Sequence, residues 1–419
     1  MSAFARMLRA SSAQAGRYVT AICLAMLLSA AAAHAQTNTT FTIQSVSNFS
    51  PVVGETVTIN GTVSAADSSV PSGTMRVAID AGPLNPAGTV VAGAVTLTST
   101  FSSAGPHSII ARFVPDNTTA YNISNTRSVN LTAVQASTTT ALTSSLNPSV
   151  AGQPVTFTAT VSVTAPGTGT PTGAVNFLDG GTLIGTGTLS GNRATFTTSS
   201  LPTGSRTITA VYVGDSNYTT STSSAVAQRV DPNSTTTALA SSANPSTVGQ
   251  SVTLTATITP AISTSLSPTG TVTFSDGGTP IGTGTVSGGV ATFTTSSLSL
   301  GNHSLRASYG GDTNFNGSSV FSVPQTVNQD ATSTTLSSSA NPGTAGVAVT
   351  FTATVAPASP TSGAPTGTVS FFDGATLLGT GTLSGGSASF TTSSLPIGSR
   401  SIPASIREMP TIPRRRRQR

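Results

Sequence analysis

Hydrophobic and polar residues alternate along most of the chain after residue 36. From Val155 to Val161 apolar residues occupy every second position, with threonines between them, and the same alternation returns at 252–258 and 349–355. A period of two buries one face of a β-strand and leaves the threonine hydroxyls on the other face. Because Val and Thr are also β-branched, the pattern predicts an all-β protein.

Turn signals separate these stretches at short intervals. In one unit a strand at 174–178 is followed by Asp179-Gly180-Gly181, where glycine accepts the positive φ of a tight hairpin. Further strands are expected at 183–189, 194–196 and 206–213. About seven short strands in roughly 100 residues are typical of a β-sandwich.

The whole pattern repeats every 97 residues. Asn147-Pro148 recurs as Asn244-Pro245 and as Asn341-Pro342, and the turn that begins at Asp179 recurs at Asp276 and Asp373. A fixed period of this kind indicates tandem copies of one module. The predicted domains are a divergent repeat at 36–135, full repeats at 136–231 and 232–329, and a truncated repeat at 330–402.

The repeats resemble the bacterial Ig-like domains of large secreted and cell-surface proteins. The motifs that carry the resemblance are Thr139-Thr140-Ala141-Leu142, Asn147-Pro148, Pro171-Thr172-Gly173, Phe177-Leu178-Asp179-Gly180 and Tyr212-Val213-Gly214-Asp215-Ser216-Asn217-Tyr218. The resemblance implies tandem immunoglobulin-like β-sandwiches, and such modules act as stalks, spacers or adhesive tips. The chain departs from antibody domains because it has no Trp and no cysteine pair. Aromatic rings are expected to fill that part of the core: Phe157, Phe177, Phe196 and Tyr212, with the counterparts Leu254, Phe274, Phe293 and Tyr309.

The N-terminus is interpreted as a cleaved signal peptide at 1–35. Three arginines precede an Ala- and Leu-rich stretch, and Ala33-His34-Ala35 fits a small-x-small cleavage site. A membrane anchor is the alternative, but the apolar stretch is shorter than the ~20 residues that span a bilayer. The single cysteine, Cys23, lies within this segment, so residues 36–419 offer no disulfide. Export predicts a secreted, extracellular or cell-surface location, with no membrane span in the mature chain.

The C-terminal residues 403–419 do not continue the repeat. The 97-residue period would place a second copy of Tyr309 and Asp312 at Ile406 and Met409. One choice of codons for 405–412 spells Tyr-Ser-Gly-Asp-Ala-Asn-Tyr in another reading frame, which is the expected motif, so a frameshift is the hypothesis for this Arg-rich tail. The fourth repeat is then expected to lack its two C-terminal strands, with an unpaired edge that favours disorder or aggregation.

Charge argues against a nucleic-acid partner. All 17 basic residues are arginines, of which three lie in the signal segment and six among the last 13 residues. The repeats contain the remaining eight arginines and eleven acidic residues, so they carry no excess of basic charge. Nucleic-acid binding needs a basic face. Host-surface, glycan or self-association partners remain open.

The sequence gives no catalytic constellation. His107 and His303 precede strands at comparable points of two repeats, where Arg206 and Arg400 stand in the others, and this position is expected to be solvated. Asp116, Asp215 and Asp312 are weak calcium candidates, since each loop supplies one Asp beside an Asn and calcium prefers six to eight oxygens. No enzyme activity and no cofactor are therefore expected.

The expected function is a non-catalytic stalk or adhesion protein that spaces or presents a binding region. Four sandwiches in a row would project roughly 150 Å at ~3.4 Å per strand residue. The alternative is a carbohydrate-binding accessory module. Sugar-binding platforms usually expose aromatic rings, and this chain has no Trp and five Tyr.

Overall fold

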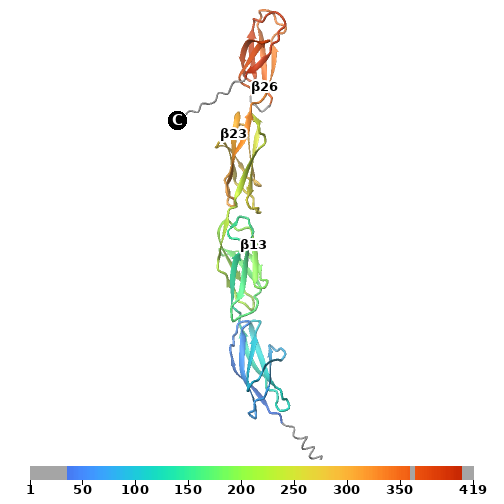
Figure 1. The fold of residues 1–419 in the computed structure, drawn as a ribbon, viewed down its shortest axis with the longest axis vertical. Coiled ribbons are helices and arrows are strands. Elements are labelled where there is room, and N and C mark those ends of the chain that lie inside the picture. Colours follow the sequence, from blue (N-terminus) through green and yellow to red (C-terminus); the bar gives the residue numbers. More distant parts are fainter. Residues whose placement is uncertain (1–34, 359–363, 408–419) are drawn as a thin grey trace, which may run out of the picture. The chain divides into compact units, whose positions relative to one another are not determined.

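The structure is a computed structural model that describes residues 35–358 and 364–407. Every regular element in these residues is a β-strand, as the alternation predicts (Figure 1). The strands form sheets that pair within each repeat into a two-layered sandwich. The predicted signal peptide lies outside the described residues, as do the arginines at 414–417.

The first sandwich has a three-stranded and a four-stranded sheet. The first sheet, in spatial order, consists of β1 (Thr39–Val46), β2 (Thr56–Ala65) and β5 (Ala94–Thr100). The second sheet, in spatial order, consists of β4 (Asn85–Thr89), β3 (Gly73–Ile79), β6 (Gly105–Pro115) and β7 (Arg127–Ala133). Phe41, Met75 and Phe113 are fully buried between the two sheets.

The second sandwich repeats this arrangement and adds two short edge strands. Its smaller sheet consists of β13 (Arg193–Thr198), β10 (Val155–Val163) and β8 (Thr138–Ser144). Its larger sheet consists of β12 (Thr182–Thr188), β11 (Ala174–Asp179), β14 (Gly204–Tyr212), β16 (Val226–Asp231) and β9 (Ser149–Val150), with β15 (Ser221–Thr222) beside β14. The last strand, β16, thus lies between β14 and β9, and its pairing with β9 is parallel.

The third sandwich has the same topology as the second. Its smaller sheet consists of β17 (Thr235–Ser241), β19 (Val252–Pro260) and β22 (Val290–Thr295). Its larger sheet consists of β18 (Ser246–Thr247), β24 (Ser318–Asn328), β23 (Gly301–Tyr309), β20 (Thr271–Asp276) and β21 (Thr279–Thr285). As in the second sandwich, the last strand separates a long strand from a two-residue edge strand.

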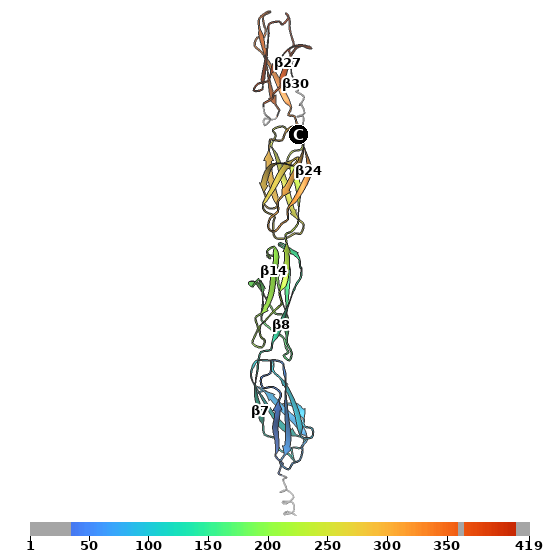
Figure 2. The same ribbon diagram turned by 90° about the vertical axis from the view of Figure 1, so that its left-hand side faces the viewer.

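The fourth sandwich is incomplete within the described residues. Its smaller sheet consists of β25 (Thr332–Ser338), β26 (Val349–Pro357) and β29 (Ser387–Thr392). Its larger sheet consists of β28 (Thr376–Thr382), β27 (Thr368–Asp373) and β30 (Ala404–Arg407) (Figure 2). No strand of the described chain occupies the place that β24 takes in the third sandwich.

Strand β30 continues the repeat beyond Ile402, where the sequence analysis expects the repeat to stop. Val369 pairs with Ile406, as Val272 pairs with Tyr309 in the third sandwich, so the register of the repeat is kept. Ala404 and Ile406 pack against the core of the fourth sandwich. One of the two strands expected to be missing is therefore present in shortened form, because alternate residues still supply an apolar face.

Alternation sets the core of every sandwich. In β10 the buried positions Val155, Phe157, Ala159 and Val161 are those that the period of two predicts. Phe177 and Tyr212 are also fully buried, and the Phe177 and Phe196 rings stack with centroids 5.7 Å apart. The expectation that aromatic rings replace the Trp and disulfide of antibody domains is confirmed.

The first glycine of the repeated Gly-Thr-Gly motif has a packing role. The ring of Phe293 on β22 reaches across to β21, so a Cβ at Gly282 would lie 2.1 Å from its Cε2. Gly185 and Gly379 face Phe196 and Phe390 at the same separation. Glycine is required here because the ring occupies the space of a side chain.

The predicted hairpin turns are confirmed. Gly180 and Gly181 have φ angles of 56° and 87°, and Gly277 and Gly278 repeat this conformation. Two successive positive φ angles match the right-handed twist of the flanking strands. The turn joins β11 to β12 and places Asp179 at the end of β11.

Candidate functional sites

The loop after β14 is organised around Asp215. Its Oδ2 accepts hydrogen bonds from the Thr172 amide (2.9 Å) and the Thr172 hydroxyl (2.6 Å). Its Oδ1 accepts from the amides of Asn217 (2.8 Å) and Tyr218 (2.9 Å). Burial alone would raise the pKa of Asp215, but these hydrogen bonds outweigh burial and lower the pKa below 3.8.

The same loop recurs in the third sandwich. Asp312 accepts hydrogen bonds from the amide and hydroxyl of Thr269 and from the amides of Asn314 and Phe315, at 2.6–2.9 Å. Burial and the charge of Asp312 raise the pKa of the neighbouring Tyr309 to about 12, so its phenol is neutral at physiological pH. In both repeats the carboxylate joins the loop to the preceding Pro-Thr-Gly segment.

Each of these loops also holds the first residues of its own sandwich. The Ala136 amide donates to the Asn217 carbonyl (2.9 Å), and the Asn233 amide donates to the Asn314 carbonyl (2.8 Å). Asn233 is fully buried, and its side-chain amide donates to the Ile262 carbonyl at 2.6 Å. The loop therefore fixes where the chain enters the sandwich.

The first sandwich closes the corresponding loop differently. Asp116 is exposed there, and the neighbouring Asn117 accepts the hydrogen bonds from the amides of Thr119 and Ala120, both at 3.1 Å. Asp116 is thus equivalent to Asp215 in sequence position but not in contacts. The sequence analysis grouped Asp116, Asp215 and Asp312 by their spacing and missed this difference. The difference arises because the acceptor in the first sandwich is the next residue along the chain.

The structure does not bring the three candidate aspartates together with other acidic side chains. Across 35–358 and 364–407, no group of three or more His, Cys, Asp or Glu side chains is placed to hold a metal ion. Both oxygens of Asp215 and Asp312 already accept hydrogen bonds from their own loops. Calcium binding at these loops remains a prediction, and a bound ion would have to compete with these contacts.

A second repeated polar feature pairs the aspartate of the Gly turn with a His or Arg on a neighbouring segment of the chain. His107 Nδ1 lies 2.6 Å from Asp80, and His303 Nδ1 lies 2.7 Å from Asp276. In the other two sandwiches the pairs are Arg206 with Asp179 and Arg400 with Asp373, both at 3.4 Å.

The two histidines are not solvated, so that expectation is wrong. The side chains of His107 and His303 are only 8% and 7% exposed. The carboxylate on one side and a backbone carbonyl on the other make the burial tolerable: His303 Nε2 lies 2.7 Å from the Ser299 carbonyl. The position looked exposed because a charged residue fills it in every repeat.

The surroundings of these histidines favour the imidazolium. Burial lowers the pKa of His303, but the bonds to Ser299 and Asp276 outweigh burial and raise the pKa above 6.5. The pKa of His107 is raised in the same way by Asp80 and Ser103. Both ring nitrogens face acceptors, so the protonated ring satisfies both contacts, at the position that arginine fills in the other two sandwiches.

The repeated Asn-Pro motif anchors the last strand of each complete sandwich. The Asn147 side-chain amide donates to the Ala227 carbonyl (2.7 Å), and that of Asn244 donates to the Pro324 carbonyl (2.8 Å). The buried Gln228 and Gln325 donate in return to the carbonyls of Leu146 and Ala243, both at 2.9 Å.

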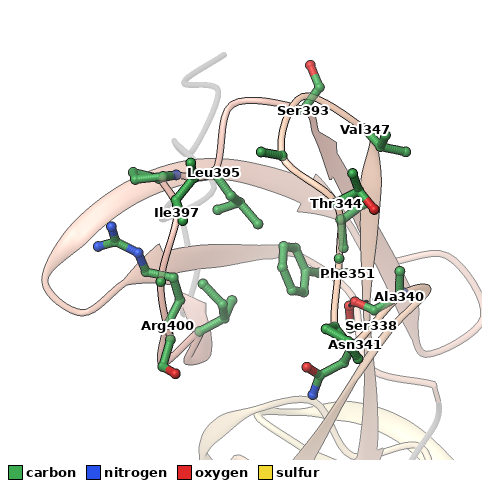
Figure 3. Close-up of a pocket in the computed structure, with 18 of the residues that line it drawn as sticks. Ser338, Ala340, Asn341, Thr344, Val347, Phe351, Ser393, Leu395, Ile397 and Arg400 are labelled. Carbon is green, nitrogen blue, oxygen red and sulfur yellow. Dashed lines mark hydrogen bonds between the residues drawn. The ribbon is translucent and has the colours of Figure 1, made fainter.

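The fourth sandwich has a cavity of about 790 Å³ at the equivalent place. It is lined by the Asn341 turn, by the end of β25 and by the segment 395–402. Figure 3 shows the Phe351 ring between this segment and the Asn341 turn. Ile397 on the rim is 89% exposed.

No helix in the described part of the chain is long and apolar enough to cross a membrane.

Comparison with known families gives a match over most of the chain. The family described as bacterial Ig-like domain (group 3) matches residues 142–231, 239–328 and 336–405. The matched segments coincide with the second, third and fourth sandwiches. Among curated proteins no match was found.

Similar solved structures cover a large part of the chain, with low sequence identity. The integrin-binding protein invasin is 13% identical, with 80% of this chain and 81% of invasin covered and a TM-score of 0.35. The D0-D1 domain of intimin is 19% identical, with coverages of 45% and 98% and a TM-score of 0.18. The fibronectin(III)-like modules of Clostridium thermocellum CbhA are 22% identical, with coverages of 45% and 94% and a TM-score of 0.18.

Proposed function

Because the chain belongs to the bacterial Ig-like domain (group 3) family, we propose that it is a secreted or cell-surface protein whose sandwiches space or present a binding region without catalysis. One observation carries this proposal. The most conspicuous polar contacts recur from repeat to repeat, and each is closed within its own sandwich. Asp215 and Asp312 hold their loops through hydrogen bonds, and the Gly-turn aspartates pair with the Arg or His beside them.

This use of polar groups supports a mechanical role. A catalytic site needs nucleophiles, acids or bases whose reactive atoms face a substrate. Here the repeated carboxylates and imidazoles form their hydrogen bonds with groups of their own sandwich. The low share of charged residues, 7%, leaves a surface rich in Ser and Thr hydroxyls, which suits solubility and weak contacts.

Protease accessibility on intact cells tests the proposed location. In cells that produce the full chain, an externally added protease should degrade the repeats while a cytoplasmic marker protein stays intact. A matched sample of lysed cells shows that the marker is itself cleavable. Retention of undegraded chain inside intact cells would contradict the proposal.

A glycan array with the full chain separates the stalk from the carbohydrate-binding alternative. The chain is expected to give no saturable glycan binding, because the strongly exposed Phe side chains among the described residues are Phe49 and Phe321, one in the first sandwich and one in the third. Saturable binding to a defined glycan that Phe49→Ala or Phe321→Ala abolishes would favour the carbohydrate-binding module.

A further inference from the structure

Within the described residues, the fourth sandwich has an open edge where the second and third sandwiches hold their last strand. In the third sandwich, residues 301–304 at the start of β23 pair with β24, and Leu305 to Tyr309 pair with β20 as well. In the segment of the fourth sandwich that corresponds to β23, residues 404–407 form a strand, whereas 398–401, the equivalents of 301–304, do not. Among the described residues, no strand pairs with the backbone of 398–401.

The complete sandwiches show what covers this place. The last strands share the sequence Val-x-Gln-x-Val, as 226–230 in β16 and as 323–327 in β24. The Gln and the second Val point inward: Gln228 and Val230 are at most 2% exposed, and Gln325 and Val327 likewise. Each strand is also paired in parallel with the short strand that follows the Asn-Pro turn.

The groups that receive the last strand are retained in the fourth sandwich. Ser338 donates to the Ala340 carbonyl at 2.9 Å, as Ser144 and Ser241 donate to the equivalent carbonyls at 3.1 Å, so the turn keeps its shape. Asn341 lines the cavity at the position from which Asn244 bonds to β24.

The apolar part of the receiving surface is also present. Phe351 is buried at the floor of the cavity, and Leu336 on β25 is 36% exposed beside it. Leu336 corresponds to Leu142 and Leu239, which are only partly exposed in the complete sandwiches. A strand with alternating apolar residues would cover these side chains and satisfy the backbone of the open edge.

We propose that the fourth sandwich binds an extended segment with the pattern Val-x-Gln-x-Val from a partner chain, which takes the place that β24 has in the third sandwich and that no described residue of the fourth fills. The inward Gln of this segment bonds to the Ala340 carbonyl, and the Asn341 amide donates to the backbone carbonyl of the residue before that Gln. The flanking valines cover Phe351 and Leu336. This docking surface is independent of whether the chain acts as a stalk.

A peptide with the sequence of residues 222–231 is the probe. Fluorescence anisotropy of the labelled peptide is measured against the full chain, and saturation at one peptide per chain is expected. The same peptide with Gln228→Glu and Val230→Glu should bind at least about tenfold more weakly, because a buried unpaired carboxylate is costly. This variant leaves the receiving protein unchanged, so misfolding cannot explain the loss.

The receiving side is tested with a matched pair of variants. Asn341→Ala should weaken peptide binding about fivefold, the effect of one hydrogen bond. Asn244→Ala removes the same side chain from a sandwich whose last strand is in place, and it should leave the affinity unchanged. Hydrogen exchange of the full chain should show new protection of the Ala345 amide on binding, as expected from Val248, whose amide donates to β24.

Several results would overturn the proposal. They are equal binding of the doubly substituted peptide, no saturable binding of the original peptide, an Asn341→Ala variant that binds as well as the parent chain, and a dimer of the chain that persists at saturating peptide and blocks its binding. The last would mean that a second copy covers the open edge by other contacts. Binding only after removal of residues 408–419 would likewise assign the place to the chain's own C-terminal residues.

Discussion

At the scale of single residues, a few polar side chains join segments of the same repeat through hydrogen bonds. Asp312 is the clearest example, because one carboxylate accepts four hydrogen bonds from two segments of the third sandwich. The spacing of Asp215 and Asp312 in the sequence is accounted for by this role. The first sandwich shows that the loop can instead be closed by an Asn at the next position, Asn117.

Replacing Asp312 is expected to destabilise the third sandwich. Asp312→Ala should lower its local unfolding free energy by about 2 kcal/mol, because hydrogen bonds to charged groups are worth more than neutral ones and the freed amides are partly hydrated. Hydrogen exchange of amides in 232–329 of the full chain measures this. Asp116→Ala is the control and should change the first sandwich by less than about 0.5 kcal/mol.

The stabilisation by Asp312 also has a pH dependence. Because the pKa of Asp312 is lowered from 3.8, its contribution is present above that value and is lost as the pH falls through the lowered pKa. Equal losses for the Asp312→Ala and Asp116→Ala variants would contradict the assigned role.

His303 predicts a dependence on pH in the opposite direction. Its pKa is raised above 6.5, so its pairing with Asp276 stabilises the third sandwich fully below 6.5 and is lost as the pH rises through the raised pKa. His303→Arg should remove this loss, since arginine holds the position in the second and fourth sandwiches. The free energy of local unfolding between pH 6 and 9 tests it, and an unchanged slope in the variant would refute the pairing.

At the scale of elements, the packing of one sheet on the other explains why glycines, which are typical of turns, occur within a strand. The Gly282 to Thr285 stretch has the composition of a loop, yet it is part of β21. It stays a strand because β21 pairs with β20 and because Phe293 from the opposite sheet covers the glycine. The stacked Phe274 and Phe293 rings, with centroids 5.7 Å apart, join the two sheets.

A methyl group at Gly282 should therefore disturb this joint. Gly282→Ala is expected to cost about 1–3 kcal/mol, because its Cβ would overlap the Phe293 ring and force a shift of packed elements. The control Gly310→Ala adds a Cβ that meets nothing within 4 Å. The measurement is hydrogen exchange of the third sandwich in the full chain.

A double-substituted chain decides whether the ring is the cause. In a Phe293→Ala background, Gly282→Ala should cost much less than in the parent chain, because the overlapping ring is gone. Costs that simply add would show that Gly282 is needed for another reason.

At the scale of the whole molecule, the four sandwiches share one design but differ in completeness. The second and third have a last strand that closes the larger sheet, and the first closes it with β7. In the described part of the fourth, β30 ends that sheet and its backbone edge is open. Edges of this kind are prone to local opening and to pairing with other chains.

The fourth sandwich is accordingly expected to be the first to open. Limited proteolysis of the full chain should cut within 330–407 before it cuts within 136–329, and the peptide with the sequence of residues 222–231 should slow that cleavage. Mass spectrometry of early fragments identifies the cut sites. Initial cleavage within the second or third sandwich would contradict this order.

The sequence by itself determined the strands, the hairpin turns and the repeat, because each depends on a local pattern. The alternation at 155–161 and the Gly180-Gly181 pair are visible over a few residues, and a strand or turn follows from them wherever they occur. The copies at 97-residue spacing then predicted the same sandwich more than once.

Only the tertiary structure decided what the polar residues do. His303 meets Asp276 27 residues away, and Asn244 meets Pro324 80 residues away. Such pairs depend on strand register and on the distance between two sheets, which no short stretch of sequence encodes. For the same reason a position that seemed solvated holds a histidine with little exposed side chain beside an aspartate, and the Asn-Pro motif anchors a strand that the fourth sandwich does not hold among its described residues.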